Sequence, residues 1–392
     1  MLAAAAAAAV AFLLLRGGGD GEDSSYSPVG PGSDPWVYDS DRQGEFEARA
    51  AAGYSHVVYV KSPGGIVATA ARVARYRGDV EKAAAEAGVD PDLIEGMVLL
   101  ESAGIPDARA SDDLESAAGL TQILAETATG LLGMKVDVQA SERLTRKLAR
   151  AHGPSEAARI RAQRARVDER FDPAKALAAT GRYLKQAKDE FGREDLAVVS
   201  YHMGIGNLQS VLGAYGDDGS SYAQLYFDAS PDSHARAYRL LYRLGDDSKT
   251  YYWRVLASRE VMRLYRGDRA KLERLADLQA GASSGELVLH PDGPADDTEP
   301  GALRPEAAAV LAYIRNGVTT VGGVRRPLRV VRRHGFAFDI RRDYATDAQA
   351  QAFQYMLDRL QALNVIAWAR LGNVIHVVAS SEGKRLLDAG GE

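Results

Sequence analysis

The chain has 392 residues, 46% of them apolar, and a formal net charge of −5, so it has room for two or three domains with sizeable hydrophobic cores. A net charge this small gives no indication of nucleic-acid binding. The absence of cysteine excludes disulfides, thiolate metal sites and lipid attachment through a cysteine.

The N-terminus carries a candidate export signal. Residues 2–15 form an unbroken apolar run, followed by Arg16 and three glycines. This run is shorter than the ~20 residues of a membrane-spanning helix and resembles the apolar part of a signal peptide, although no Lys or Arg precedes it. We expect residues 1–16 to be a signal peptide or an N-terminal anchor and the protein to act in the periplasm or outside the cell. The alternative is an alanine-rich disordered tail.

A flexible linker is expected at residues 17–35, which are rich in Gly, Asp, Ser and Pro, and helical patterns dominate residues 36–280. Within them, Asp90 suits a helix N-cap and Pro91 the first helical position. Gly104 provides a stop. These signals predict a short helix that ends at Glu101 and Ser102.

Two later helices carry similar signals. Asp172, followed by a proline, predicts the start of a helix that stops near Gly192. Asp195 is expected to start the next helix, which carries Tyr201 and ends at Gly204.

Glu101 shares a helix face with apolar residues. Ile94, Met97, Val98 and Glu101 stand at positions i, i+3, i+4 and i+7. Partial burial and the negative end of the helix dipole both favour the neutral form of such a carboxyl group. A carboxylic acid that stays protonated near neutral pH can donate a proton to a glycosidic oxygen. The alternative is a frayed helix end whose side chain reaches water.

Two further segments accompany Glu101 and Ser102. They are Gly-Leu-Thr-Gln at residues 119–122 and Tyr-His-Met-Gly-Ile-Gly-Asn at residues 201–207. In order and rough spacing the three resemble the motifs of SLT-type lytic transglycosylases, which read Glu-Ser, Gly-Leu-Met-Gln and Ala-Tyr-Asn-Ala-Gly-x-Gly-Asn. The resemblance implies a mainly α, lysozyme-like helical lytic domain over residues 36–280.

The resemblance also implies roles for individual residues. Glu101 takes the position of the catalytic acid/base, and the substrate-binding residues are Ser102, Gln122, Tyr201, His202 and Asn207. Thr121 and His202 depart from the family, which has methionine and asparagine there. The charge of a histidine in that position would vary with pH. For Tyr201 and Gln122 the alternative is ordinary packing and helix solvation.

A second carboxylate distinguishes two reaction types. A glycosidase that delivers water needs one across the scissile bond, whereas a lytic transglycosylase does not. Asp112, Asp113 or Glu115 could fill that role if their loop folds over the groove, and a solvated loop is the alternative.

A second linker at residues 281–303 precedes a small α+β domain at residues 304–388. Strand-like runs occupy residues 327–331 and 336–340, and Thr346 has capping-box spacing before a helix. Two further strand-like runs, 365–369 and 374–378, predict a hairpin that turns at residues 371–373.

This small domain resembles a degenerate zinc D-alanyl-D-alanine carboxypeptidase. Asp339 matches that family's second zinc ligand and His376 the third. Arg332 occupies the position of the first histidine, and His334 is out of register by two residues. A cation at residue 332 opposes zinc, so we expect no metal site. The basic residues nearby could meet stem-peptide carboxylates or an anionic wall polymer, with a solvated strand face as the alternative; they are Arg325, Arg326, Arg329, Arg332 and Arg333.

The resemblances together imply an exported enzyme that cleaves the MurNAc-GlcNAc β-1,4 bond of peptidoglycan and leaves 1,6-anhydroMurNAc, without a cofactor. The expected partner is the glycan strand and not nucleic acid. A hydrolytic muramidase and a catalytically silent cell-wall-binding scaffold are the alternatives.

Overall fold

The structure, a computed structural model, describes residues 34–281 and 302–389. The expected signal peptide or anchor at residues 1–16, and nearly all of the linkers expected at 17–35 and 281–303, lie outside these ranges. Among the described residues, no helix is both long and apolar enough to span a membrane.

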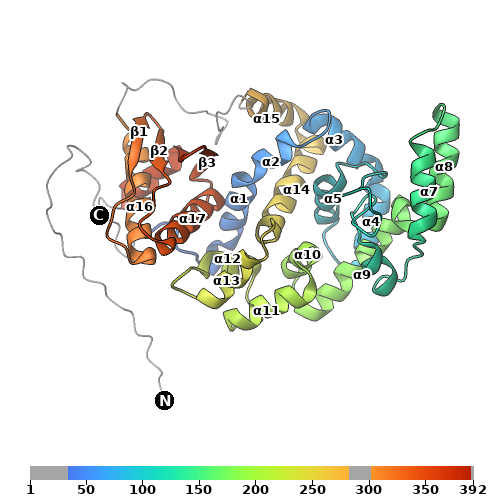
Figure 1. The fold of residues 1–392 in the computed structure, drawn as a ribbon, viewed down its shortest axis with the longest axis horizontal. Coiled ribbons are helices and arrows are strands. Elements are labelled where there is room, and N and C mark those ends of the chain that lie inside the picture. The colour runs from blue at the N-terminus through green and yellow to red at the C-terminus, as the bar shows by residue number, and fades with distance from the viewer. Residues whose placement is uncertain (1–33, 282–301, 390–392) are drawn as a thin grey trace, which may run out of the picture.

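Helices make up most of the elongated body formed by the described residues up to 281 (Figure 1). They are α1 (Gln43–Gly53), α2 (Ser55–Val60), α3 (Ile66–Val73), α4 (Arg77–Ala87), α5 (Pro91–Ser102), α6 (Ala125–Gly130), α7 (Val138–Leu148), α8 (Pro154–Val167), α9 (Pro173–Phe191), α10 (Glu194–Met203), α11 (Ile205–Tyr215), α12 (Tyr222–Asp228), α13 (Ala235–Arg243), α14 (Tyr251–Gly267) and α15 (Arg269–Gly281). Short 3-10 turns connect some of them: η1 (Ser40–Arg42), η2 (Ala74–Tyr76), η3 (Glu169–Phe171) and η4 (Ser248–Thr250).

The predicted helix starts at Asp90 and Asp172 are confirmed. The Asp90 carboxylate accepts a hydrogen bond from the Asp92 amide at 2.9 Å, and Asp172 accepts one from the Lys175 amide at 3.2 Å. Each satisfies an N–H group that has no partner inside the helix.

The predicted start at Asp195 is wrong by two residues. The N-cap of α10 is Arg193, and Asp195 lies in the first turn. Its buried carboxylate accepts hydrogen bonds from the Arg193 side chain at 3.0 Å and from the Tyr222 amide at 2.8 Å. Asp195 therefore joins α10 to α12, a role that depends on a residue 27 positions away.

The packing of α5 against α14 depends on a glycine. A Cβ atom at Gly96 would lie 2.8 Å from the Val255 carbonyl oxygen and 3.0 Å from the Arg259 amide nitrogen. Both distances are closer than side-chain carbons normally approach a backbone. Only glycine at this position lets the two helices lie this close.

An ion cluster fastens the start of α5 to α4 and to the end of α14. Glu95 is fully buried and contacts Arg77 at 2.9 Å and also Arg266. Asp92 contacts Arg77 at 2.6 Å, Arg266 at 2.9 Å and Arg263 at 3.1 Å. Since a buried carboxylate is costly without a partner, these arginines fix the position of α5.

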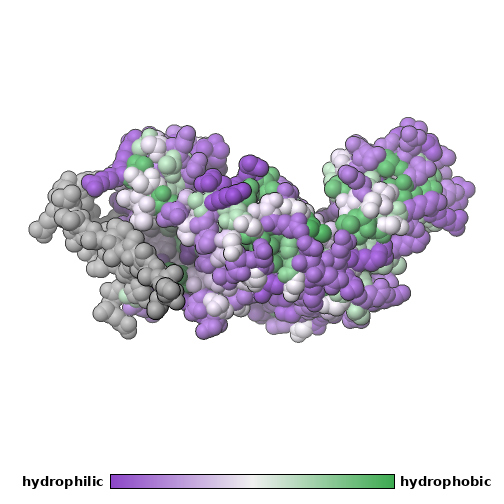
Figure 2. Space-filling view, turned by 90° about the horizontal axis from the view of Figure 1, so that it is seen from below, coloured by the Kyte–Doolittle hydropathy of each residue, from purple (hydrophilic) through white to green (hydrophobic). Residues whose placement is uncertain are grey.

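Helices α7 and α8 form a lobe at one end of the body (Figure 1). The buried Arg164 of α8 contacts Asp107, which lies in the loop after α5, and donates to the Thr145 hydroxyl of α7 at 3.2 Å. The molecular surface is hollowed between the body and the end that carries this lobe, with hydrophobic side chains on both flanks (Figure 2). Asp107 thus joins the lobe to the segment that follows Glu101.

The C-terminal residues form a four-stranded antiparallel sheet with helices, in the strand order β1-β2-β4-β3 (Figure 1). The elements are α16 (Pro305–Gly322), β1 (Val330–His334), β2 (Ala337–Arg341), α17 (Asp347–Ala362), β3 (Ile366–Leu371), β4 (Val374–Ala379), the 3-10 turn η6 (Ser381–Gly383) and α18 (Lys384–Ala389). With the helical body, this sheet confirms the predicted fold class.

The predicted strands and the cap at Thr346 are found with small shifts. The first strand begins at Val330, three residues later than predicted, because Pro327 has no N–H group to pair in a sheet. The Thr346 hydroxyl accepts a hydrogen bond from the Gln349 amide at 3.1 Å. The predicted hairpin turns at Gly372, whose φ of +58° suits glycine.

The C-terminal module packs directly on the helical body. A Cβ atom at Gly53 of α1 would lie 1.9 Å from the Gln361 carbonyl oxygen of α17. The Arg359 side chain of α17 donates to the Trp36 carbonyl at 2.7 Å and to the Phe227 carbonyl at 2.6 Å. Buried apolar residues continue from one part into the other, so both share one core.

We expect Gly96→Ala to lower the free energy of unfolding by about 1–3 kcal/mol, because the added methyl group overpacks the α5-α14 contact. Gly213→Ala is the matched control, since it lies in helix α11 with open space around its Cβ position. Urea unfolding of both variants measures the difference. Equal stability of the two would contradict the role given to Gly96.

Candidate active site

Glu101 lies in the last turn of α5. Three apolar residues on its helix face, Ile94, Met97 and Val98, are fully buried. The chain leaves the helix at Ala103, which has a φ of +53°, one residue before the expected stop at Gly104. The Glu101 side chain is partly exposed, so it lies at the edge of the core and within reach of a ligand.

Tyr251, the first residue of α14, holds one oxygen of Glu101. Its hydroxyl donates a hydrogen bond to Glu101 Oε1 at 2.7 Å. Burial raises the pKa of Glu101 to about 7, although the Tyr251 hydrogen bond and the charge of Arg254 act against it, and the charge of Asp247 adds to the rise. The carboxyl group is therefore largely protonated below pH 7 and can donate a proton there.

Tyr201 joins α10 to the loop at residues 119–123. Its hydroxyl donates to the Thr121 carbonyl at 2.7 Å, and its ring packs edge-on against Tyr183 with centroids 5.2 Å apart. Burial and then the charge of Glu101 raise the pKa of Tyr201, so the phenol stays neutral beside the carboxyl group. The structure thus brings Tyr201 and Glu101 together.

Gln122 lies in a tight turn. Its φ is +52°, and its side-chain amide donates to the Gly119 carbonyl at 2.8 Å. A Cβ atom at Gly119 would lie 1.9 Å from the Arg170 carbonyl oxygen, so no other residue fits there. The turn is therefore shaped by its own hydrogen bond and by its contact with Arg170.

A buried ion pair holds the loop that carries Gln122. Arg170 is fully buried and binds Asp168 through Nε at 2.9 Å and Nη2 at 2.8 Å. The same guanidinium donates to the carbonyl oxygens of Leu114 at 2.7 Å, Ser116 at 3.0 Å and Ile123 at 3.3 Å. A planar guanidinium with five N–H donors can satisfy such a set. Arg170 therefore holds the backbone of the loop, independently of the side chains that the loop carries.

His202 is part of a polar cluster beside Tyr251. Its ring stacks on the Tyr251 ring with centroids 4.9 Å apart, and its Nδ1 lies 2.8 Å from the Ser248 hydroxyl. Its Nε2 lies 3.6 Å from Asp247 Oδ1, and Arg254 contacts the same carboxylate. Burial raises the pKa of Asp247, but the hydrogen bond and charge of Arg254 outweigh it, so the net shift is downward. The charge of Asp247 thus acts on Glu101 and favours its protonated form.

The other two expected substrate-binding residues use their side chains within the helices. The buried Ser102 hydroxyl donates to the Val98 carbonyl at 3.2 Å. The Asn207 amide donates to the Met203 carbonyl at 2.8 Å and joins the end of α10 to the start of α11. The structure gives both a local structural role.

The loop carboxylates form contacts within their own loop. Asp112 is exposed and pairs with Arg109 at 3.2 Å, and Asp113 accepts a hydrogen bond from the Glu115 amide at 2.9 Å. The carboxylate whose charge acts on Glu101 is instead Asp247.

The expected zinc positions in the C-terminal module lie side by side across the sheet. Arg332 pairs with Asp339, and Asp339 pairs with His376 in the strand register. His376 Nδ1 lies 2.7 Å from Asp339 Oδ1. Among the described residues, no group of three or more His, Cys, Asp or Glu is arranged to hold a metal. The relationship to the carboxypeptidases stays a prediction.

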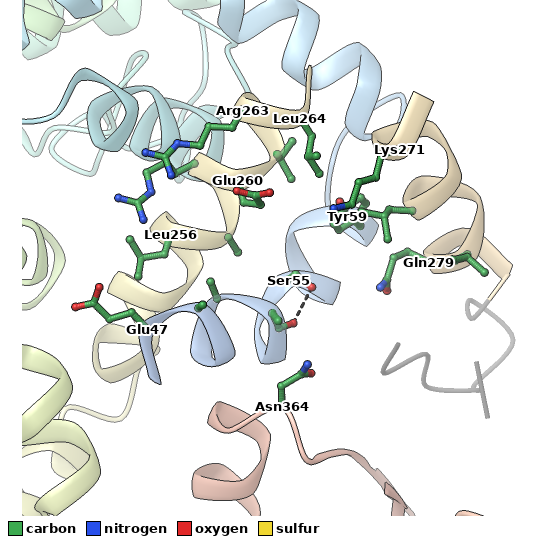
Figure 3. A pocket seen from close by; sticks show the side chains of 18 of the residues that line it. Glu47, Ser55, Tyr59, Leu256, Glu260, Arg263, Leu264, Lys271, Gln279 and Asn364 are labelled. Carbon is green, nitrogen blue, oxygen red and sulfur yellow. Dashed lines mark hydrogen bonds between the residues drawn. The ribbon is translucent and has the colours of Figure 1, made fainter. Parts of the chain in front are cut away.

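A separate cavity of about 670 Å³ lies between α1, α2, α14 and α15, with Asn364 at its edge (Figure 3). Its α14 wall runs from Leu256 to Leu264, beyond the turn that carries Tyr251. None of the site residues expected from the sequence lines it. This cavity is therefore separate from the place where the acid lies.

Four members of the site are not predicted from the sequence, namely Asp247, Ser248, Tyr251 and Arg254. Two of them meet partners far away along the chain: Tyr251 bonds Glu101, 150 positions away, and Ser248 bonds His202, 46 positions away. The aromatic run Tyr-Tyr-Trp at residues 251–253 was the available signal, because a phenol at a helix start can carry both packing and a hydrogen bond.

Comparison with known proteins finds a family match within the helical body. Residues 148–223 match the family model of the Transglycosylase SLT domain. This stretch contains Tyr201, His202 and Asn207, whereas Glu101 and Gln122 precede it. The match supports the resemblance to SLT-type lytic transglycosylases and suggests lytic transglycosylase activity on peptidoglycan. No curated protein matches the chain.

Glu101→Gln is expected to stabilise the fold at alkaline pH. The folded-state pKa of about 7 lies above the ordinary 4.5, so the folded protein binds the extra proton and loses stability as the pH rises through 7. A shift of this size corresponds to up to about 3 kcal/mol, and a neutral amide avoids the loss.

Urea unfolding at about pH 5 and about pH 8.5 measures this effect. Between the lower and the higher pH, the free energy of unfolding of the variant should rise relative to that of the wild type by about 2–3 kcal/mol. A difference that does not change with pH would show that Glu101 titrates normally.

Proposed function

We propose that the protein is a lytic transglycosylase that cleaves the MurNAc-GlcNAc β-1,4 bond of peptidoglycan and leaves a 1,6-anhydroMurNAc end. The observation that carries this proposal is the hydrogen bond from Tyr251 to Glu101 at the edge of the core, where burial raises the pKa of Glu101 to about 7. The motif resemblance and the matched SLT segment supply the substrate class.

The proposed reaction begins with proton transfer from Glu101. Because Tyr251 occupies Oε1, the other oxygen is left for the glycosidic oxygen of the substrate. The C1–O bond of MurNAc breaks as that oxygen takes the proton and leaves with the GlcNAc unit. The carboxylate formed is stabilised by the Tyr251 hydroxyl and by the charge of Arg254.

The second step returns the proton. The 6-hydroxyl oxygen of the same MurNAc bonds to C1 while Glu101 accepts the hydroxyl proton as a general base. No water is consumed, and the acid is regenerated. Neither step needs a metal or an organic cofactor, since proton transfer by one carboxyl group serves both.

A muramidase is the second candidate, and Asp247 is the observation that favours it. An ionised carboxylate near a protonated one is the arrangement that glycosidases use to deliver water. We favour the lytic reaction because Asp247 is engaged by Arg254 and lies close to His202, which leave it poorly placed to activate water.

Export and wall contact belong to the same proposal. The apolar run at residues 2–15 supports a periplasmic or extracellular location, released or anchored. The arginines around β1 offer a basic surface for stem-peptide carboxylates or an anionic wall polymer. Two of them, Arg326 and Arg329, lie 3.8 and 3.7 Å from the carboxylate of Asp343. The glycan strand remains the principal partner.

Glu101→Gln should abolish glycan cleavage, by at least about 100-fold, and leave glycan binding intact, because the amide keeps the shape but has no proton to transfer. Mass spectrometry of digested sacculi measures the products. Glu115→Gln, in the exposed loop, is the matched control and should cleave normally.

The same product analysis distinguishes a lytic transglycosylase from a muramidase and from a scaffold. Ends that are heavier by one water, without anhydro sugar, would identify a muramidase. If wild type and Glu101→Gln both bind glycan and neither cuts it, the protein is a scaffold.

Tyr251→Phe should raise the pKa of Glu101 above about 7 and so move the alkaline limb of the kcat/KM profile to higher pH, because it removes the hydrogen bond that lowers that pKa. The rate at the optimum should fall about 10- to 100-fold, since a hydrogen bond to an ionised group contributes about 1.5–3 kcal/mol. Tyr252→Phe, on the adjacent core tyrosine, is the control. An unchanged profile in Tyr251→Phe would remove Tyr251 from the site.

A further inference from the structure

A buried carboxylate of the C-terminal module reaches into the helical body. Asp358 of α17 is 7% exposed. Its Oδ2 accepts hydrogen bonds from the Lys249 ammonium and the Tyr242 hydroxyl, each at 2.8 Å, and its Oδ1 accepts one from Gln354 at 2.8 Å. A carboxylate this buried depends on these donors. Lys249 supplies the balancing positive charge.

Lys249 makes contacts through both its side chain and its backbone. Its ammonium lies 3.3 Å from the centroid of the Tyr242 ring, and its side chain is mostly buried. Its carbonyl oxygen accepts a hydrogen bond from the Tyr222 hydroxyl at 2.6 Å. The turn η4, of which Lys249 is the middle residue, is therefore fixed by both its side chain and its backbone.

The neighbours of Lys249 in sequence are the residues that contact the acid site. Ser248 bonds His202 at 2.8 Å, and Tyr251, two residues after Lys249, bonds Glu101 at 2.7 Å. Asp247, which contacts Arg254, precedes Ser248 directly. A displacement of this turn would move all three contacts at once.

We propose that Asp358 is a positioning residue for the glycan-cleaving reaction: through Lys249 it fixes the turn that aims Tyr251 and Ser248 at the acid site. The C-terminal module thereby becomes a required part of the active site. This inference rests on the proposed function. Because misplacing a contact by about 1 Å can cost about 100-fold in rate, a carboxylate that touches no substrate can control turnover.

Asp358→Asn in the full chain tests the proposal, with Glu382→Gln as the matched control. Both remove one carboxylate charge from the contact between module and body, but Glu382 pairs with Arg49 of α1, away from η4. Kinetics on glycan, melting temperature and pH profile are measured for both.

We expect Asp358→Asn to lower kcat about tenfold or more with KM changed less than about twofold, and to shift the alkaline limb in the same direction as Tyr251→Phe. Glu382→Gln should stay within about twofold of wild type in kcat. Equal effects of the two substitutions would overturn the proposal.

Lys249→Met keeps the test valid if Asp358→Asn unfolds. It removes the cation but retains an apolar chain of similar length, so it should reproduce the loss of kcat. The double variant should be no worse than the more affected single variant, because both act through one contact. Additive losses would contradict the coupling.

A measurement that does not depend on glycan cleavage tests this inference independently of the proposed function. Carbon NMR of the labelled Glu101 carboxyl group follows its titration, which responds to Tyr251, Arg254 and Asp247. Its pKa should rise in Asp358→Asn and stay unchanged in Glu382→Gln. A wild type that fails to cut glycan refutes the proposed function, whereas an unmoved titration refutes the role of Asp358.

Discussion

The close contact between α5 and α14 is the constraint on which the rest of the site depends. Gly96 lets the helices approach, and the pairing of Glu95 with Arg77 and Arg266 fixes the start of α5. The other end of α5 then meets the first residue of α14, where the Tyr251 hydroxyl reaches Glu101. The acid is held between two rigid elements rather than on a loop, which favours a constant geometry.

The same packing shifts the pKa values of two carboxyl groups in opposite directions. Burial raises the pKa of Glu101 to about 7, while Arg254 lowers the pKa of Asp247, whose charge acts on Glu101. Environments that push two pKa values apart are typical of sites that transfer protons. Because the buried carboxyl group would ionise more readily in water, it lowers the stability of the fold at alkaline pH, and the packing of the surrounding core offsets this loss.

Buried ion pairs place the loops around this rigid centre. Arg170 and Asp168 hold the loop of Gln122 through its carbonyl groups, and Asp358 and Lys249 hold the turn before α14. Such pairs contribute little net stability, since desolvation cancels much of their attraction. Their directional hydrogen bonds do restrict geometry, which is what a loop near a catalytic acid needs.

Features that depend on neighbouring residues can be predicted from the chain alone: the caps at Asp90 and Thr346, the hairpin at Gly372, and the position of Glu101 on an apolar helix face. These follow from hydrogen bonds and periodicity within one or two turns of chain. The partners that meet the acid cannot be predicted in this way. Tyr251 lies 150 residues from Glu101, and no local pattern specifies a contact over that separation, because it arises from how whole helices pack.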